Sequence, residues 1–428
     1  MAMFSWLALS SVAAVVASTH PDVHPSPICI NDPFGSHLPI SCPTTSSVRS
    51  PASSPEIWTD QPRCIVWRPR YGPSASSPPV KEHCLFTQAS FRSGHGVSLI
   101  STPGPASNLV GSGALSDTES FLPLSISPPR MFTPGPVVDS TGVSAYEVRD
   151  LPGKGKGVIT LRRIEKGEVF MLDYPAILAA ADFASAAWTK TQERLLQAAV
   201  SQLPRQTQRR VLDLARSQTD LDKDMALGDV FATNTCGVTL GDGGRYLGLF
   251  PEVSRMNHDC VPNAFYRLSP KTLTMQVVSY RQIDPGEEVT INLRRDHLKT
   301  DYGFTCACAL CTAPSAKRAE SDDRRMRLAR ARQEMSKAGG RGDAARAIKH
   351  AGEALVEVEA EDGLAPLACD FFAKMASLNL ELGEHAEASS LAARALEGML
   401  ELAGPDAEGG RVGEMRALMK RIHREERK

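Results

Sequence analysis

The chain has 428 residues, which is enough for two or three domains. Its formal charge of −1 comes from 48 basic and 49 acidic side chains. This balance gives the chain no general electrostatic reason to wrap on nucleic acid or on an anionic membrane. Any basic surface is local, and the Lys- and Arg-rich run after residue 419 is most simply the solvated end of a helix.

The first elements in chain order are a leader and an irregular segment. Residues 4–17, "FSWLALSSVAAVVA", are apolar but too short to cross a membrane. Val15 and Ala17 are the small residues typical of a signal-peptide cleavage site, although no Lys or Arg precedes the run. We treat residues 1–18 as a candidate signal peptide, and the alternative is a disordered or mis-assigned N-terminus.

Residues 19–143 are rich in Pro and Ser, which predicts a partly ordered, β-rich region with long loops. This region holds four of the ten cysteines, namely Cys29, Cys42, Cys64 and Cys84. After a signal-like leader, four spread cysteines suit one or two disulfides, and three pairings are open.

From about residue 144 the composition becomes that of a globular domain. Period-two alternation with Gly punctuation predicts two or three short strands over residues 145–178. Residues 184–219 read as helices that are broken near Pro204. Strand patterns return at residues 230–240, 273–283 and 287–293.

Beyond Pro314 the chain is rich in Ala, Leu and Glu and is expected to be helical. "GDAARAIKHAGEAL" begins at Gly342, and "GEHAEASSLAARAL" begins 41 residues later at Gly383. Small residues at this spacing resemble tetratricopeptide-type (TPR-like) hairpins, although the usual repeat is about 34 residues. The alternative is a plain antiparallel helical bundle, and either form offers a surface for a protein partner.

The cysteines of "YGFTCACALC" have the spacing of a metal site. Cys306, Cys308 and Cys311 lie close enough along the chain to bind one Zn²⁺. A tetrahedral zinc site has four ligands, so a fourth must come from elsewhere in the chain. Adjacent disulfides across one or two residues would be strained. Cys260 is the preferred fourth ligand. The substitutes for it are His258, His297 and Cys236.

Cys260 lies in "SRMNHDCVPNAF", residues 254–265, which also contains Asn257, His258 and Asn263. Polar side chains placed between apolar residues are costly when buried without partners. We therefore expect this stretch to be held by specific partners, one of them a metal ion.

In combination, four segments resemble SET-domain lysine methyltransferases, and especially their SET-and-MYND (SMYD-like) branch. The segments are "GKGKGV" with "IEKGEVF", then "RMNHDCVPNA", "DPGEEVTINL" and "YGFTCACALC". They cover about residues 144–315. The chain departs from the pattern at Asp259, where Ser is usual, at Leu293, where Tyr is usual, and in having no zinc-rich MYND insert.

The resemblance implies an α+β fold: a SET-domain β-clip with a helical insert and a zinc-binding post-SET segment. An all-α, TPR-like domain over residues 316–428 would follow it. Asn263 and Glu287 are expected to fix backbone groups where the SET core threads its C-terminal segment beneath a loop. Pro262 would stiffen the turn.

The implied activity is S-adenosylmethionine-dependent transfer of a methyl group to a lysine of a histone or another protein. Glycines would let the backbone approach the cofactor, the lysines would pair with its carboxylate, and Phe304 would stack on adenine. The implied cofactor-binding residues are Lys154, Gly155, Lys156, Gly157, Asn234, Ser254, Asn257, His258 and Phe304. The simpler alternatives are a solvated Gly-rich hairpin, a turn Asn at 234 and a core Phe at 304.

The resemblance makes Tyr302 the candidate catalytic residue, because its hydroxyl can orient the incoming amine. Leu293 lacks the second hydroxyl, for which Tyr266 and Tyr280 are possible substitutes. A catalytically weak or inactive SET-fold protein that acts as an interaction module is the main alternative. A secreted, disulfide-stabilised scaffold is the third reading. The family would imply a nuclear or cytoplasmic location, whereas the leader would imply the secretory pathway.

Overall fold

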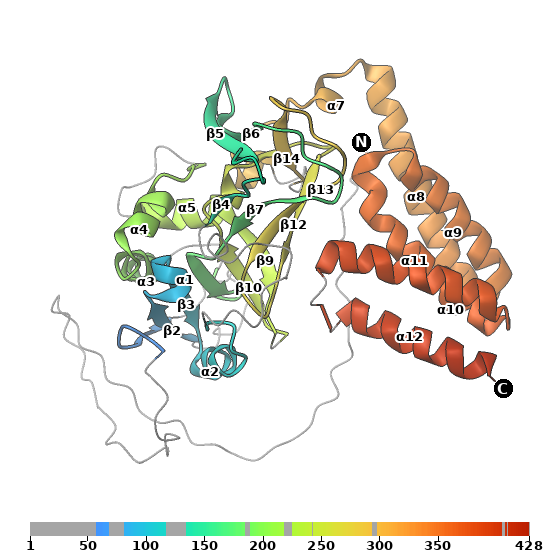
Figure 1. Cartoon of the computed structure of the whole chain (residues 1–428), viewed down its shortest axis with the longest axis horizontal. Helices are drawn as coiled ribbons and strands as arrows, with labels where there is room; N and C mark the ends of the chain where they lie inside the picture. Colours follow the sequence, from blue (N-terminus) through green and yellow to red (C-terminus); the bar gives the residue numbers. More distant parts are fainter. Residues whose placement is uncertain are drawn as a thin grey trace, which may run out of the picture.

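The computed structural model describes residues 57–67, 81–116, 134–184, 189–217, 225–241, 243–292, 298–404, 407–408 and 410–427. Four features of the sequence analysis lie outside these ranges: the candidate signal peptide, the cysteines at 29 and 42, Leu293 and His297. Figure 1 shows a strand-rich part that carries helices on one side, and a group of C-terminal helices beside it. No helix in the described ranges combines the length and apolar character needed to span a membrane.

The strands belong to the first three quarters of the chain. They are β1 Arg63–Trp67, β2 Lys81–Gln88, β3 Val97–Ser101, β4 Gly135–Pro136, β5 Tyr146–Leu151, β6 Gly155–Thr160, β7 Val169–Asp173, β8 Ile177–Ala180, β9 Thr235–Thr239, β10 Arg245–Leu249, β11 Asn257–His258, β12 Ala264–Leu268, β13 Met275–Ser279 and β14 Glu288–Ile291.

The helices are short in the strand-rich part and long after it. They are α1 Phe91–Gly94, α2 Pro103–Gly111, α3 Lys190–Ser201, α4 Arg205–Leu212, α5 Ala226–Asn234, the 3-10 helix η4 Val253–Arg255, α6 Leu298–Asp301, α7 Ala309–Thr312, α8 Ser315–Gly340, α9 Ala344–Glu359, the 3-10 helix η6 Asp362–Leu367, α10 Ala368–Glu381, α11 His385–Ala403 and α12 Gly410–Glu426.

Within the described residues the strands form three sheets. The six-stranded sheet has the order β1-β2-β3-β8-β10-β9, and the two four-stranded sheets have the orders β11-β14-β6-β5 and β12-β13-β7-β4. Buried side chains from all three sheets join one core, for example Leu99, Val289 and Val277. β3 pairs in parallel with β8, so the segment before residue 102 shares a sheet with strands of the later globular region.

The helical insert covers the outer face of the six-stranded sheet. Leu196 and Ala199 of α3 pack in one cluster with Ile100 of β3 and Ile177 of β8. The side chain of Thr189 caps α3, and Pro204 stands just before α4, where the sequence analysis expected a break. A proline there prevents α3 from continuing, because it has no backbone N–H and its ring clashes with the preceding turn.

A disulfide joins neighbouring strands of the same sheet. Cys64 of β1 and Cys84 of β2 face each other in the antiparallel register and are bonded to each other. Of the three pairings left open by the sequence, this one is present in the described residues.

Asp173 at the end of β7 fixes the turn that leads into residues 254–265. Its carboxylate accepts hydrogen bonds from the backbone N–H groups of Glu252 at 2.6 Å and Val253 at 3.1 Å, at the start of η4. Arg210 bridges this group to Glu252, with an Nη2–Oε1 distance of 2.6 Å. The beginning of the polar stretch is thus tied to the core.

The C-terminal helices form antiparallel hairpins, α8 with α9 and α10 with α11. Gly342 and Gly383 both adopt positive φ, 73° and 79°, at the sharp turns that precede α9 and α11. Several of the alanines that repeat in the sequence are fully buried, including Ala347 and Ala351 in α9 and Ala388 in α11. Small side chains at these positions let the helices approach closely.

The hairpins contact the strand-rich part along β12. Arg267 donates a hydrogen bond to the carbonyl of Glu401 in α11. Lys271 forms an ion pair with Glu408, with an Nζ–Oε1 distance of 2.8 Å.

His95 gives the strand-rich part a built-in sensitivity to acid. It is buried against the ring of Tyr174, at a centroid distance of 5.9 Å. Burial, reinforced by Arg210, lowers the pKa of His95 to about 4. In the unfolded chain the His95 imidazole binds a proton near pH 6.5, whereas in the folded protein it stays neutral down to about pH 4. The stability of the fold with a neutral His95 is therefore complete above pH 6.5 and is lost as the pH falls to 4.

We therefore expect His95 to contribute about 3 kcal/mol of acid sensitivity between pH 6.5 and 4, at about 1.4 kcal/mol per pKa unit. Urea unfolding of the wild type and of His95→Gln over this range would measure it. Burial raises the pKa of Asp173 to about 7, which acts in the opposite sense. The difference between the two proteins isolates His95, and parallel pH profiles would contradict this expectation.

Candidate functional site

One four-stranded sheet brings together three of the motifs singled out in the sequence. β14 lies between β11, which carries Asn257 and His258, and β6, which begins at Gly155. β11 pairs in parallel with β14, with Asn257 opposite Thr290. β5, β6 and β14 can be followed together at the upper part of Figure 1. Segments about 100 residues apart in the sequence are therefore neighbours.

The glycines of β6 allow a close approach to Asn257. Gly155 has a φ of +70°, a conformation that side chains rarely allow. A Cβ added to Gly157 would lie 2.9 Å from Asn257 Nδ2 and would overlap the side chain of Leu151. The side chain of Asn257 can occupy its position only because residue 157 has none.

The amide of Asn257 is held from one side only. Its Nδ2 donates to Glu288 Oε1 at 2.8 Å and to the carbonyl of Lys156 at 3.3 Å. Among the described residues, none donates a hydrogen bond to Asn257 Oδ1. This half-buried residue therefore retains an acceptor for a ligand.

The two lysines beside the glycines have acidic partners that the sequence did not indicate. Lys154 Nζ lies 2.6 Å from Glu288 Oε2, and Lys156 Nζ lies 2.5 Å from Asp213 Oδ2. Asp213 also pairs with Arg255 at 2.8 Å. Glu288 belongs to the recognisable Gly-Glu-Glu segment, whereas nothing in the sequence around Asp213 marks it.

Ser254 and Asn234 lie next to each other, at the turn of η4 and the end of α5. Ser254 Oγ lies 3.0 Å from the carbonyl of Asn234 and 2.8 Å from that of Phe250. Asn234 Nδ2 donates to the carbonyls of Ala215 and Val230. These bonds fix the local backbone, and the Asn234 side chain keeps its carbonyl oxygen as an acceptor.

His258 faces the cysteines. Its imidazole Nε2 lies 3.4 Å from Cys260 Sγ, and the side chain is buried. Its side chain therefore belongs with the sulfur cluster, while its backbone stays in the sheet beside Asn257.

The sulfur cluster consists of Cys260, Cys306, Cys308 and Cys311. All four Sγ atoms lie within 4.8 Å of one another. Cys260 Sγ is 3.9 Å from Cys306 Sγ and 3.6 Å from Cys311 Sγ. Tetrahedral Zn–S bonds of about 2.3 Å require sulfurs about 3.8 Å apart, so the arrangement fits a zinc ion.

Burial and crowding of the sulfurs oppose the loss of the Cys260 proton. Burial, together with the neighbouring Cys308 and Cys306, raises the pKa of Cys260. Of the alternative fourth ligands, Cys236 lies elsewhere, on β9, where its thiol faces the carbonyl of Gly248.

Asn263 and Glu287 hold the loop of residues 259–263 against β14. Asn263 Oδ1 accepts from Thr290 N at 2.8 Å, and Asn263 Nδ2 donates to the Glu288 carbonyl at 2.8 Å. Glu287 pairs with Arg281 and lies 3.4 Å from Asn263 Nδ2. The buried Asn263 amide thus satisfies two backbone groups, as the sequence analysis expected, whereas Glu287 is half-exposed and pairs mainly with Arg281.

Tyr302 and Phe304 follow α6, just before the cysteines. Tyr302 is half-buried, and the ring of Phe304 is 39% exposed, which leaves it open to a ligand. The Cys236 thiol, burial and the nearby Tyr302 raise the pKa of Tyr266 well above its usual value. The Tyr266 hydroxyl lies beside the Cys236 thiol. Sequence reasoning missed this Cys236–Tyr266 pair.

Comparison with known proteins identifies the region that holds β6, β11 and β14. Residues 155–293 match the SET domain family. The chain contains a SET domain. This confirms the resemblance to SET-domain lysine methyltransferases of the SMYD-like branch that the motifs predicted.

The similar curated proteins carry names of the same kind. Histone-lysine N-methyltransferase set5 of Schizosaccharomyces pombe is 30% identical over 194 residues, 43% of this chain and 56% of that protein. N-lysine methyltransferase SMYD2 of Homo sapiens is 34% identical over 110 residues, 23% of this chain and 25% of that protein. A SET and MYND domain-containing protein of Dictyostelium discoideum is 39% identical over 74 residues, 15% of this chain and 21% of that protein. The matched segments thus span about half of these relatives' lengths or less.

We expect Asn263→Ala to lower the free energy of unfolding by about 2–3 kcal/mol, because it leaves two buried backbone groups without partners. Asn257→Ala is a matched control on β11, just before this loop, and should cost less than about 1 kcal/mol, because Asn257 is half-buried and its partners stay hydrated. Urea unfolding at neutral pH measures both changes. Equal losses in the two variants would contradict the bracing role of Asn263.

Proposed function

We propose that the chain is an S-adenosylmethionine-dependent protein-lysine N-methyltransferase. The observation that carries the proposal is the juxtaposition, within a SET domain, of the open Asn257 acceptor and the side-chain-free face of Gly157. We assign residues 144–315 to the catalytic unit, with its helical insert and post-SET segment, and residues 316–428 to a TPR-like helical domain. The substrate class is a lysine of a histone or of another protein.

The residues that would hold the cofactor surround β6 and β11. Asn257 Oδ1 would accept from the ammonium group of the cofactor, and Lys154 or Lys156 would turn toward the cofactor's carboxylate. Gly155 and Gly157 leave room for the methionine part, and the exposed ring of Phe304 offers a face for adenine. Ser254, Asn234 and the backbone of His258 complete the proposed wall.

The sulfur cluster would hold one structural Zn²⁺. With all four positions filled by thiolates, the ion would have no open site for chemistry. Its role would be to fasten the segment with Tyr302 and Phe304 to the loop that carries Cys260, which directly follows Asn257 and β11.

The bound cofactor would supply a methyl group on a positively charged sulfur. The chain must then align a lysine amine with that methyl group, keep the amine neutral and exclude water. Tyr302 would accept a hydrogen bond from the amine and so orient the amine lone pair toward the methyl group. Burial in an aromatic environment favours the neutral amine, because it penalises the charged form.

The Leu at position 293 removes one hydroxyl from this arrangement. Tyr266 is the better substitute, since Tyr302 is near enough to contribute to the raised pKa of the Tyr266 hydroxyl. Tyr280 packs on Phe265 at a centroid distance of 4.7 Å, and burial and the nearby Glu401 raise its pKa.

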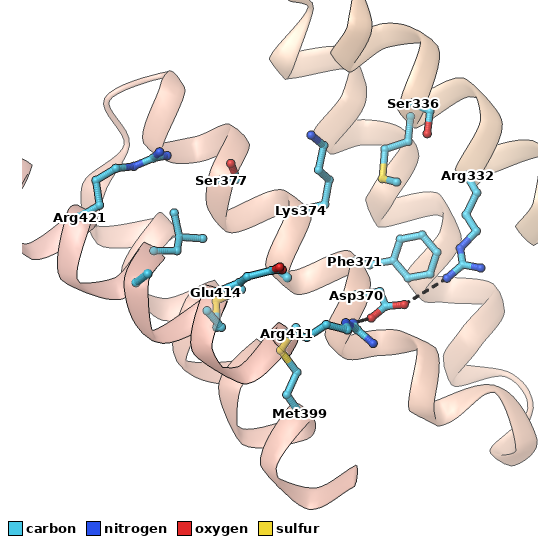
Figure 2. Close-up of a pocket in the computed structure, with 15 residues that line it drawn as sticks. Arg332, Ser336, Asp370, Phe371, Lys374, Ser377, Met399, Arg411, Glu414 and Arg421 are labelled. Carbon is cyan, nitrogen blue, oxygen red and sulfur yellow. Dashed lines mark hydrogen bonds and ion pairs between the residues drawn. The ribbon is translucent and has the colours of Figure 1, made fainter. Parts of the chain in front are cut away.

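A second candidate is a SET-fold interaction module with little or no transferase activity. It is favoured by the substitution at 293 and by a groove among the C-terminal helices. The groove encloses about 1000 Å³ between α8, α10, α11 and α12 (Figure 2). Its floor includes Phe371 and Met399, and Asp370 at one end pairs with Arg332 and Arg411. Such a groove could receive a protein partner.

Methyl transfer to a mixed protein panel with labelled S-adenosylmethionine tests the first candidate. We expect Tyr302→Phe to lower the transfer rate roughly 10- to 100-fold, because one positioned hydrogen bond is lost. Cofactor affinity and thermal stability should change little, since the ring is kept. Unchanged transfer would refute the role of Tyr302, and cofactor binding without transfer in the wild type would select the interaction module.

Metal analysis of the purified chain tests the zinc site. We expect about one zinc per chain. Cys311→Ser should lose the metal and weaken cofactor binding, because the post-SET segment is released. Cys369→Ser is the matched control, a lone buried cysteine in α10 outside the cluster, and should keep the metal. A zinc-free wild type with four freely titrating thiols would contradict the site.

A further inference from the structure

We propose that Glu288 is a positioning residue that fixes the orientation of the Asn257 amide toward the cofactor. This inference rests on the proposed function and adds a residue to it. Glu288 divides its carboxylate between two candidate cofactor-binding side chains. Oε1 accepts from Asn257 Nδ2 at 2.8 Å, and Oε2 pairs with Lys154 Nζ at 2.6 Å.

The orientation follows from the chemistry of the groups around Asn257. An amide can present either its oxygen or its NH₂ group to a neighbour, and the two orientations differ only by a flip. Both neighbours of this amide, the Glu288 carboxylate and the Lys156 carbonyl, only accept hydrogen bonds. The flipped amide would place its oxygen against two other oxygens. Glu288 therefore holds the Asn257 NH₂ group toward its own carboxylate and leaves Asn257 Oδ1 as the free acceptor.

The orientation of Asn257 Oδ1 determines which chemical group of a ligand can bind to it. Oδ1 can accept from an ammonium group, such as the α-ammonium of an amino acid, and cannot pair with a carboxylate. Lys154 balances the charge of Glu288, whose side chain is 19% exposed. The pair thus keeps a carboxylate close to Asn257 without leaving a free negative charge. Gly157 is required as well, because any side chain there would displace the amide.

Alternative explanations for Glu288 predict different results. If Glu288 only supported the sheet, its loss would lower the stability of the fold and the affinity for every ligand together. If its carboxylate competed with that of the cofactor for Lys154, its loss would tighten binding. If it positions Asn257, its loss weakens only ligands that carry the ammonium group, and only while Asn257 is present.

The experiment is a set of calorimetric titrations with two ligands, S-adenosylmethionine and 5′-methylthioadenosine, which lacks the amino-acid part. We expect Glu288→Ala to weaken S-adenosylmethionine binding roughly 10-fold and to leave 5′-methylthioadenosine binding unchanged. Glu288→Gln keeps an oxygen that can accept from Asn257 and should recover part of the loss. Glu147→Ala is the matched control: this residue lies on β5 of the same sheet, pairs with Arg149 and should have no effect.

A double-mutant cycle tests that Glu288 acts through Asn257. In the Asn257→Ala background, Glu288→Ala should cost less than about 2-fold in S-adenosylmethionine affinity. A full 10-fold loss in that background, an equal loss for both ligands, or tighter binding would each overturn the proposal. A wild type that binds neither ligand would instead overturn the proposed function, on which this inference depends.

Discussion

The parallel pairing of β11 with β14 is the constraint on which the rest of the site depends. The two residues of β11 pair with β14. Asn263 then fastens the loop that follows β11 to the backbone of β14. Because the loop is fixed at both ends, Asn257 and Cys260 have set positions only three residues apart. One short strand pairing therefore determines both the open amide acceptor and one corner of the sulfur cluster.

The electrostatics of this region differ from what the local sequence suggests. "GKGKG" alone indicates a free basic turn, yet both lysines pair with acidic side chains from distant parts of the chain. These pairs are partly exposed, so each contributes little to stability. Their effect is on ligand binding. Before a ligand carboxylate can pair with either lysine, that lysine must leave its acidic partner.

The sequence predicted contacts only between residues that stand in marked motifs. The three clustered cysteines meet Cys260, and Asn263 contacts Glu287, although each contact joins two separate motifs. It could not predict Glu288 as the partner of Lys154, which lies 134 residues away. The Cys236–Tyr266 pair joins two strands of different sheets, and no local pattern encodes such a contact. Pairings across long separations are fixed by the packing of the whole core.

The first three strands have a practical consequence for how this domain can be isolated. β3 pairs along β8, and Leu85 and Ile100 fill the layer under α3. A fragment cut to the borders of the family match would begin after these strands. It would leave one side of β8 as a bare hydrogen-bonding edge over an apolar layer, which is the geometry that drives strand-to-strand self-association. A fragment that keeps this edge and layer covered therefore has to include β2 and β3.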